Sequence, residues 1–212
     1  MPATGSASRP QPPSPASVFV AILGVLCTAL PSLAAEKDLY TVAPATSKVT
    51  FYAHATGHDF EGTTGDVRGH IRFDVADLSG TASGEVRVMA STLDTGIDRR
   101  NQNMWDLLEA VKHPDIVFTL EKATVEAVTG AAQKAGMLPP KITLIGTLEV
   151  RGVRKPLTIP VELEPAEGAV VVRGSFPVDM RDFGIEPPRA AFVIRTQPQV
   201  RVDFETRFQR AE

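Results

Sequence analysis

The feature that most constrains this chain is the alternation of apolar and polar residues, which begins at about residue 39 and recurs almost to the end. From Val67 to Val75, every odd position is apolar or glycine and every even position is polar. Successive side chains of a β-strand point to opposite faces, so this pattern predicts strands with one buried face. A chain of amphipathic helices would instead place apolar residues three and four positions apart.

Seven more segments alternate in the same way, so we expect roughly eight strands of about eight to ten residues. Their apolar faces contain Val49, Phe51, Ala53 and Ala55; Val86, Val88 and Ala90; Ile116, Phe118 and Leu120; Ile142, Leu144, Gly146, Leu148 and Val150; Leu157, Ile159, Val161 and Leu163; Val170, Val172, Gly174, Phe176 and Val178; and Val200, Val202 and Phe204. Such faces must be buried in a sandwich of two sheets or in a closed barrel. Glycines within three apolar faces, Gly69, Gly146 and Gly174, favour the barrel, because strands bend at glycine where a barrel turns its corners. We predict an all-β fold, an eight-stranded antiparallel β-barrel with one short helix.

The short helix is predicted over residues 101–111, where apolar residues from Met104 to Val111 recur at helical spacing and Pro114 follows. We expect it to cap one end of the barrel. Turn residues separate the predicted strands at 61–65, 78–80, 151–152 and 167–168, and residues 129–140 are predicted to be a surface loop.

Residues 18–30 form an apolar, uncharged run of 13 residues, which is shorter than the about 20 residues that a membrane-spanning helix needs. Ser32 and Ala34 then give the small-x-small pattern of a secretory cleavage site. We predict that residues 1–34 are a signal peptide and that residues 35–212 form the exported domain, with an uncleaved anchor as the alternative. We expect the exported domain to act outside the cytoplasm.

Charge and cysteine content exclude several classes of protein. The net charge of −3 argues against a nucleic-acid binder, which usually carries a basic excess. The single cysteine, Cys27, lies within the predicted signal and excludes disulfide frameworks and cysteine-based zinc sites. The exported domain must therefore be stabilised by its core alone, which is feasible at this length.

A search for catalytic motifs finds no GxSxG, no phosphate-binding GxxxxGK[ST], no HExxH and no GxGxxG, so we predict no catalytic residues. His54, His58 and His70 could bind zinc or copper, but the spacing is wrong for one strand, and surface histidines beside a hairpin are the simpler interpretation. We predict no metal site and no cofactor. The basic clusters at 99–100 and 151–155 could meet phosphate head groups, or they could simply face water.

Several segments, in order, resemble the YceI-like family of bacterial periplasmic polyisoprenoid-binding proteins. They are LYTVAPATSKVTF at 39–51, DVRGHIRFD at 66–74, GTLEVRGVRKPL at 146–157 and MRDFGI at 180–185. Between the second and third, Ser91 to Thr95, Arg99-Arg100, Met104-Trp105, His113-Pro114 and Phe118 follow the order of the family. Ala43 stands where the family usually has aspartate.

The resemblance, together with the predicted signal peptide, implies a periplasmic location. It also implies a lipocalin-like barrel whose apolar cavity holds a polyisoprenoid or similar long-chain amphiphile, for transport, storage or sequestration. A long-chain isoprenoid lipid or quinone is the expected ligand, with no nucleic-acid partner; a homodimer and a membrane-protein partner are left open. The residues expected to line the cavity are Phe51, Phe73, Trp105, Leu108, Phe118, Leu144, Leu148, Phe176, Phe183 and Phe204. Of these, Trp105, Leu108 and Phe183 are expected to form its mouth.

Two rival functions remain open at this point. A barrel enzyme that modifies a lipid would need a polar residue inside the barrel. A filled β-sandwich that binds a membrane redox or envelope partner would have no cavity large enough for a lipid chain.

Overall fold

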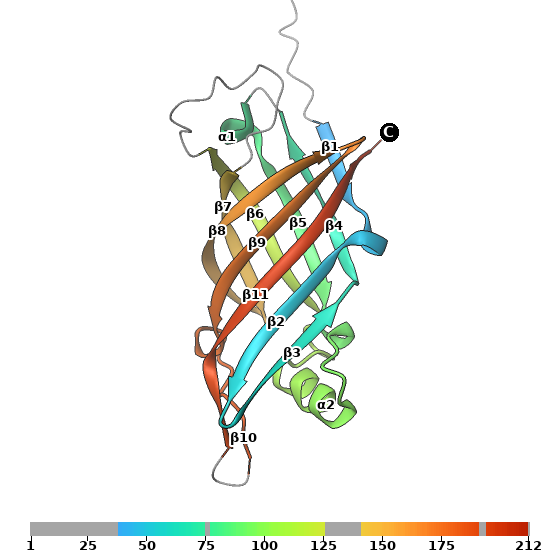
Figure 1. Cartoon of the computed structure of the whole chain (residues 1–212). Helices are drawn as coiled ribbons and strands as arrows, with labels where there is room; N and C mark the ends of the chain where they lie inside the picture. Colours follow the sequence, from blue (N-terminus) through green and yellow to red (C-terminus); the bar gives the residue numbers. More distant parts are fainter. Residues whose placement is uncertain (1–37, 75–76, 126–140, 191–193, 212) are drawn as a thin grey trace, which may run out of the picture. The chain divides into compact units, whose positions relative to one another are not determined.

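The structure, a computed structural model, describes residues 38–74, 77–125, 141–190 and 194–211 (Figure 1). These residues belong to one compact unit within the range 35–212. The predicted signal peptide at 1–34 and the predicted loop at 129–140 lie outside the described residues. The strands are β1 (Asp38–Val42), β2 (Lys48–Ala55), β3 (His58–Thr64), β4 (Val67–Phe73), β5 (Ser83–Met89), β6 (Asp115–Val125), β7 (Lys141–Val150), β8 (Val153–Ala166), β9 (Ala169–Asp179), β10 (Arg189–Ala190) and β11 (Ile194–Arg210).

The strands close into an antiparallel barrel, which confirms the predicted fold. The ring runs β1-β4-β5-β6-β7-β8-β9-β11, and pairing of β1 with β11 closes it at eight positions. Figure 1 shows the long strands wrapping steeply around one axis. Side chains of every second residue therefore point into the barrel, as the alternation predicts.

One ring position is shared by two consecutive strands. The last residues of β11 pair with β1, while Thr196 to Glu205 pair with β2. A 3₁₀ turn at Pro44–Thr46 separates the two strands, and Pro44 stands at its start, where the fixed φ of proline is favourable. Beyond this turn, β2 pairs with β3, so β3 continues the ring position of β4.

Two predicted turns are wrong. Residues 61–64 belong to strand β3 rather than to a turn, and residues 78–81 form a short helix, α1 (Leu78–Thr81). The sequence indicates a turn at Gly62, but this glycine lies within the strand and leaves space for the side chain of Phe51. A Cβ at this position would lie 2.3 Å from the Phe51 ring. In α1, the Asp77 carboxylate accepts a hydrogen bond from the Gly80 amide at 3.0 Å and caps the helix.

The predicted helix is present, with different ends. Helix α2 runs from Asp98 to Leu107, so it starts three residues earlier and ends four residues earlier than expected. Glu109 has a φ of 50°, in the left-handed region, and this conformation cannot continue the helix. Val111, expected on the apolar face of the helix, is fully exposed instead.

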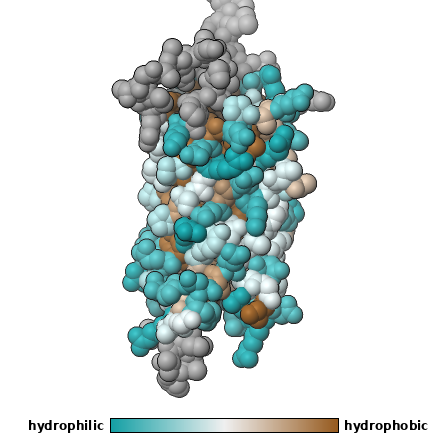
Figure 2. Space-filling model, in the orientation of Figure 1, coloured by the Kyte–Doolittle hydropathy of each residue, from teal (hydrophilic) through white to brown (hydrophobic). Residues whose placement is uncertain are grey.

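The outer surface of the barrel is mainly hydrophilic on the face shown in Figure 2. Ion pairs join neighbouring strands on the outside of the barrel. Arg173 bridges three strands in this way: its Nε donates to Glu205 at 2.8 Å, and its Nη1 pairs with Glu164. No helix in the described part of the chain is long and apolar enough to cross a membrane.

Candidate ligand-binding cavity

A cavity of about 550 Å³ occupies the interior of the barrel. Side chains of β2 to β9 and β11 line it, together with residues of both helices. At the α1 end, the wall includes Leu78 and Ala82; at the α2 end, it includes Met104 and Leu107. Pockets for small molecules usually have volumes of about 300–1,000 Å³, so this interior is large enough to be a binding site.

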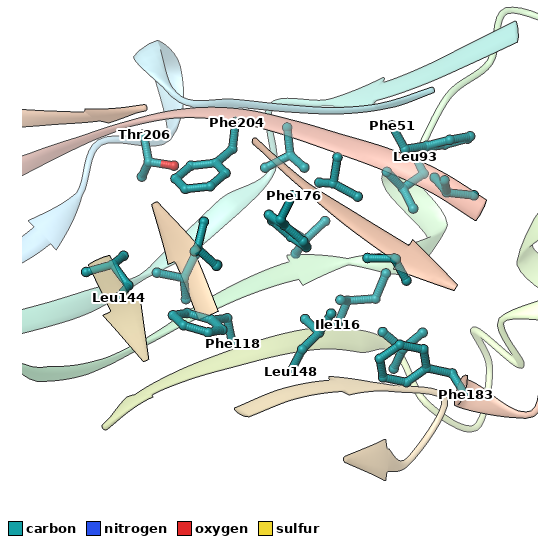
Figure 3. A pocket seen from close by; sticks show the side chains of 18 of the residues that line it. Phe51, Leu93, Ile116, Phe118, Leu144, Leu148, Phe176, Phe183, Phe204 and Thr206 are labelled. Carbon is teal, nitrogen blue, oxygen red and sulfur yellow. The ribbon is translucent and has the colours of Figure 1, made fainter. Parts of the chain in front are cut away.

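Nine of the ten residues predicted to line a cavity do so. Figure 3 shows several of them projecting from different strands toward a common space. The nine are Phe51, Phe73, Leu108, Phe118, Leu144, Leu148, Phe176, Phe183 and Phe204. Contact between any of them and a ligand stays a prediction.

Trp105 is the exception, because it does not line the cavity. It lies on α2, and its indole Nε1–H donates a hydrogen bond to the Leu93 carbonyl at 3.1 Å. A half-buried tryptophan usually directs its N–H to such a partner. Trp105 therefore ties α2 to the segment that follows β5, and the neighbouring helix residues Met104 and Leu107 face the cavity instead.

Two pairs of aromatic side chains in the cavity wall pack edge to face. The rings of Phe176 and Phe204 are 6.2 Å apart at an interplanar angle of 61°, and those of Phe51 and Phe60 are 6.3 Å apart at 88°. Gly174 makes room for one of them, since a Cβ there would lie 2.7 Å from the Phe204 ring. These contacts fix the rings along the wall, so the cavity has a defined shape.

Polar lining residues gather at one end of the cavity. They are His58 on β3, Arg100 and Asn103 on α2, and Thr196 on β11. The strand register brings His58 and Thr196 together, because Ala55 of β2 pairs with both. Arg100 reaches the same end, where it covers the ring of Phe60 on β3. His58 and Asn103 are exposed as well as lining, so the cavity reaches the surface at this end. Elsewhere, Glu85 and Thr206 are the polar lining residues among those described.

From the sequence, the basic cluster at 99–100 could contact phosphate groups or face water, and the structure separates its two arginines. Arg99 is exposed, whereas Arg100 is half-buried and lines the cavity. Its guanidinium carbon lies 4.7 Å from the centre of the Phe60 ring, within the range of a cation–π interaction. The sequence places the two arginines just before the predicted helix, whereas both lie in the first turn of α2, and the direction in which each one points depends on where the helix begins.

The start of α2 is held by a hydrogen-bond network around Asp94 and Asn101. Asp94 Oδ1 accepts from the Gly96 amide and from Asn101 Nδ2, both at 2.7 Å. These bonds, that from Gly96 first, hold the pKa of Asp94 below its usual value. Asn101 Oδ1 in turn accepts from the Thr95 amide at 2.8 Å and is buried. The network fixes the first turn of α2 and thereby the position of Arg100.

The three histidines considered as metal ligands are not brought together. His54 pairs with Asp59 on the outer surface, His58 lines the cavity, and His70 lies on β4 opposite Glu85. Among the residues that the structure describes, no group of three or more His, Cys, Asp or Glu side chains is arranged to hold a metal ion.

A closed, eight-position antiparallel barrel with an apolar interior and a polar end defines the lipocalin-like class of β-barrels. The YceI-like domain family matches residues 40–208, so the chain belongs to this family. No curated protein matches the sequence.

Solved structures share the fold at low sequence identity. BcnA of Burkholderia cenocepacia is 19% identical, with a TM-score of 0.64 over 78% of this chain and 98% of that one. A polyisoprenoid binding domain from Saccharophagus degradans, implicated in plant cell wall breakdown, is 17% identical, with a TM-score of 0.60 over 81% and 98%. The Campylobacter jejuni YCEI protein is 18% identical, with a TM-score of 0.53 over 69% and 82%.

Proposed function

We propose that this protein binds a long-chain isoprenoid, or a similar amphiphile, inside its barrel and carries, stores or sequesters it in the periplasm. The observation that carries the proposal is the cavity of about 550 Å³ with its predominantly apolar wall. Burial of an apolar tail is favourable by about 25 cal/mol per Å², so a few isoprene units would supply useful affinity. The similar fold of the polyisoprenoid binding domain from Saccharophagus degradans supports this choice of ligand.

A binding role needs no reaction, and we propose that the protein is not an enzyme. The rival idea of a lipid-modifying barrel requires a polar group beside the reacting atoms. Glu85 contacts the cavity, but its carboxylate accepts from Arg87 Nε at 2.6 Å, and Arg87 is exposed. Residues two apart on a strand share a face, so this carboxylate lies on the outer side of β5 and not beside a bound tail. The rival idea of a filled sandwich is disfavoured by the volume of the cavity.

The first experiment is to express the protein in a bacterial host, purify the mature form, extract it with organic solvent and identify bound lipid by mass spectrometry. We expect an isoprenoid quinone, a polyprenyl lipid or a related amphiphile at a near-stoichiometric level. Repeated recovery of lipid-free protein that also fails to bind added isoprenoids would overturn the proposal.

The second experiment narrows the cavity. Leu144 lines it and is half-buried, so Leu144→Trp places an indole where a tail would lie. If the indole displaces about 60 Å² of tail contact, affinity falls by about 1.5 kcal/mol, or roughly tenfold. The matched control is Ile145→Trp, which adds a similar bulk at the next position of β7, on the face that does not line the cavity. Equal lipid binding by both variants would contradict an internal site.

A further inference from the structure

The guanidinium of Arg100 has unused hydrogen-bonding capacity at the polar end of the cavity. Its Nη2 donates to the Thr95 carbonyl at 2.7 Å, while its Nε is buried and has no hydrogen-bond partner. Among the described residues, no carboxylate forms an ion pair with it. Arg151 at the same end of the barrel is different, because it pairs with Glu109 and donates to the Gly184 carbonyl.

Such an arginine is costly for the apo protein. A buried donor without an acceptor loses the hydrogen bonds that water would provide, and the loss is larger for a charged group. Arg100 also lies in the first turn of α2, where the helix dipole disfavours a positive charge. Neither its hydrogen bonding nor its place in the helix therefore explains why an arginine stands here.

The surroundings favour a ligand group that carries both negative charge and acceptor oxygens. Asn103 stands three residues after Arg100 on α2, so both side chains occupy one side of the helix, and both line the cavity. His58 lines the same end, with its ring 6.2 Å from that of Phe60, the ring that Arg100 covers. A planar guanidinium binds carboxylate and phosphate oxygens through paired N–H groups, and Phe60 holds it in place.

We propose that Arg100, assisted by Asn103 and His58, binds the anionic head group of the amphiphile, a carboxylate or a phosphate. This inference rests on the proposed function, because it requires the tail of the same ligand to fill the apolar barrel. It also orients the ligand: the head lies at the α2 end, and the tail extends past Phe176 and Phe118 toward Leu78 of α1. Neutral amphiphiles with the same tail would bind more weakly.

The test compares ligands that share a tail. Binding of geranylgeranyl phosphate and geranylgeraniol, and of palmitate and hexadecanol, is measured by titration calorimetry with the full chain. We expect the wild type to bind the anionic member of at least one pair about tenfold or more tightly, since a charge-assisted hydrogen bond contributes about 1.5–3 kcal/mol. Arg100→Gln should remove this preference and leave the affinity for the neutral alcohol nearly unchanged.

The matched control is Arg99→Gln, which removes the same charge from the adjacent, exposed position of α2. It should keep the preference, and thermal unfolding should show that both variants are folded. Inorganic phosphate in a third arm separates a lipid head group from a free anion: it should bind far more weakly than the lipid phosphate.

Each outcome of the test decides one of the two proposals. Tight binding of alcohols and anions alike, unchanged in Arg100→Gln, overturns the head-group site and leaves the lipid cavity standing. Equal binding of inorganic phosphate and lipid phosphate also overturns the head-group site. Failure of the protein to bind any of the four amphiphiles overturns the proposed function itself.

Discussion

At the scale of single residues, Gly146 shows a constraint that acts on one position. A Cβ at this position would lie 2.1 Å from the carbonyl oxygen of Thr119 on the neighbouring strand, so alanine forces β6 and β7 apart. We expect Gly146→Ala to lower the free energy of unfolding by about 1–3 kcal/mol, the usual cost of overpacking. Urea denaturation followed by circular dichroism measures this.

The control for that substitution is Gly65→Ala. Gly65 lies between β3 and β4, and a Cβ there would meet its nearest neighbour at 3.5 Å, an ordinary van der Waals distance. Its stability should therefore stay close to that of the wild type. Equal stability of Gly146→Ala and Gly65→Ala would show that close approach at Gly146 is not a constraint.

The inward direction of single side chains could be predicted where the sequence alternates. The alternation places Phe118, Leu144 and Leu148 on inner faces, and all three line the cavity. From the sequence, Arg100 and His58 could be a phosphate contact and a metal ligand, but neither is predicted to line the cavity. Neither belongs to an alternating segment, and the direction of each side chain depends on where a helix and a hairpin begin.

At the scale of elements, strands are easier to predict than the breaks between them. The inner faces of β4 to β9 follow from alternation, which depends on local geometry alone. β1 and β2 share one ring position because both pair with β11. β3 continues as a strand through Gly62 because that glycine packs closely against the ring of Phe51. Such contacts join residues far apart in the sequence, so no local pattern reports them.

The end of α2 is tied to the β7–β8 hairpin by one ion pair. Arg151 Nε donates to Glu109 Oε1 at 2.8 Å, and Nη1 donates to the Gly184 carbonyl at 2.7 Å. The hydrogen bond from Arg151, more than any other contact, lowers the pKa of Glu109. A lowered folded-state pKa means that the pair stabilises the fold above the ordinary pKa of glutamate, and that this stability is lost as pH falls through the folded-state value.

We therefore expect Glu109→Gln to lower the midpoint of thermal unfolding at neutral pH, with the difference from the wild type vanishing in acid. Thermal unfolding measured across acidic to neutral pH checks this. Asp179, whose pKa is lowered to about 2 mainly by the hydrogen bond from the Arg181 side chain, is present in both proteins, so its titration cancels from the difference between them. A midpoint difference that persists unchanged into acid would contradict the role of the ionised carboxylate.

At the scale of the whole molecule, alternation does not distinguish a filled barrel from a hollow one. Both need the same inner faces, and the difference lies in how far the ring opens and how the large side chains pack. Here eight ring positions leave about 550 Å³ unfilled, although Phe176 and Phe204 both point inward. Eight strands give an interior just wide enough either to be filled by side chains or to hold one small ligand, so sequence alone could not decide.

An interior that is occupied by lipid should make the stability of the whole barrel depend on that lipid. A ligand that binds only the folded state stabilises it by RT ln(1 + [L]/Kd), which is about 2.7 kcal/mol when the free ligand is a hundredfold above Kd. For a domain of this size, each kcal/mol moves Tm by about 2–4 °C, so saturation should raise Tm by roughly 5–10 °C. Scanning calorimetry of the delipidated protein, before and after addition of geranylgeranyl phosphate, measures the shift. Leu144→Trp binds roughly tenfold more weakly, so the same ligand concentration is only about tenfold above its Kd and the shift should be about half. Ile145→Trp should show the full shift, since Ile145 does not line the cavity. An equal shift in all three proteins would place the lipid on the outer surface of the barrel.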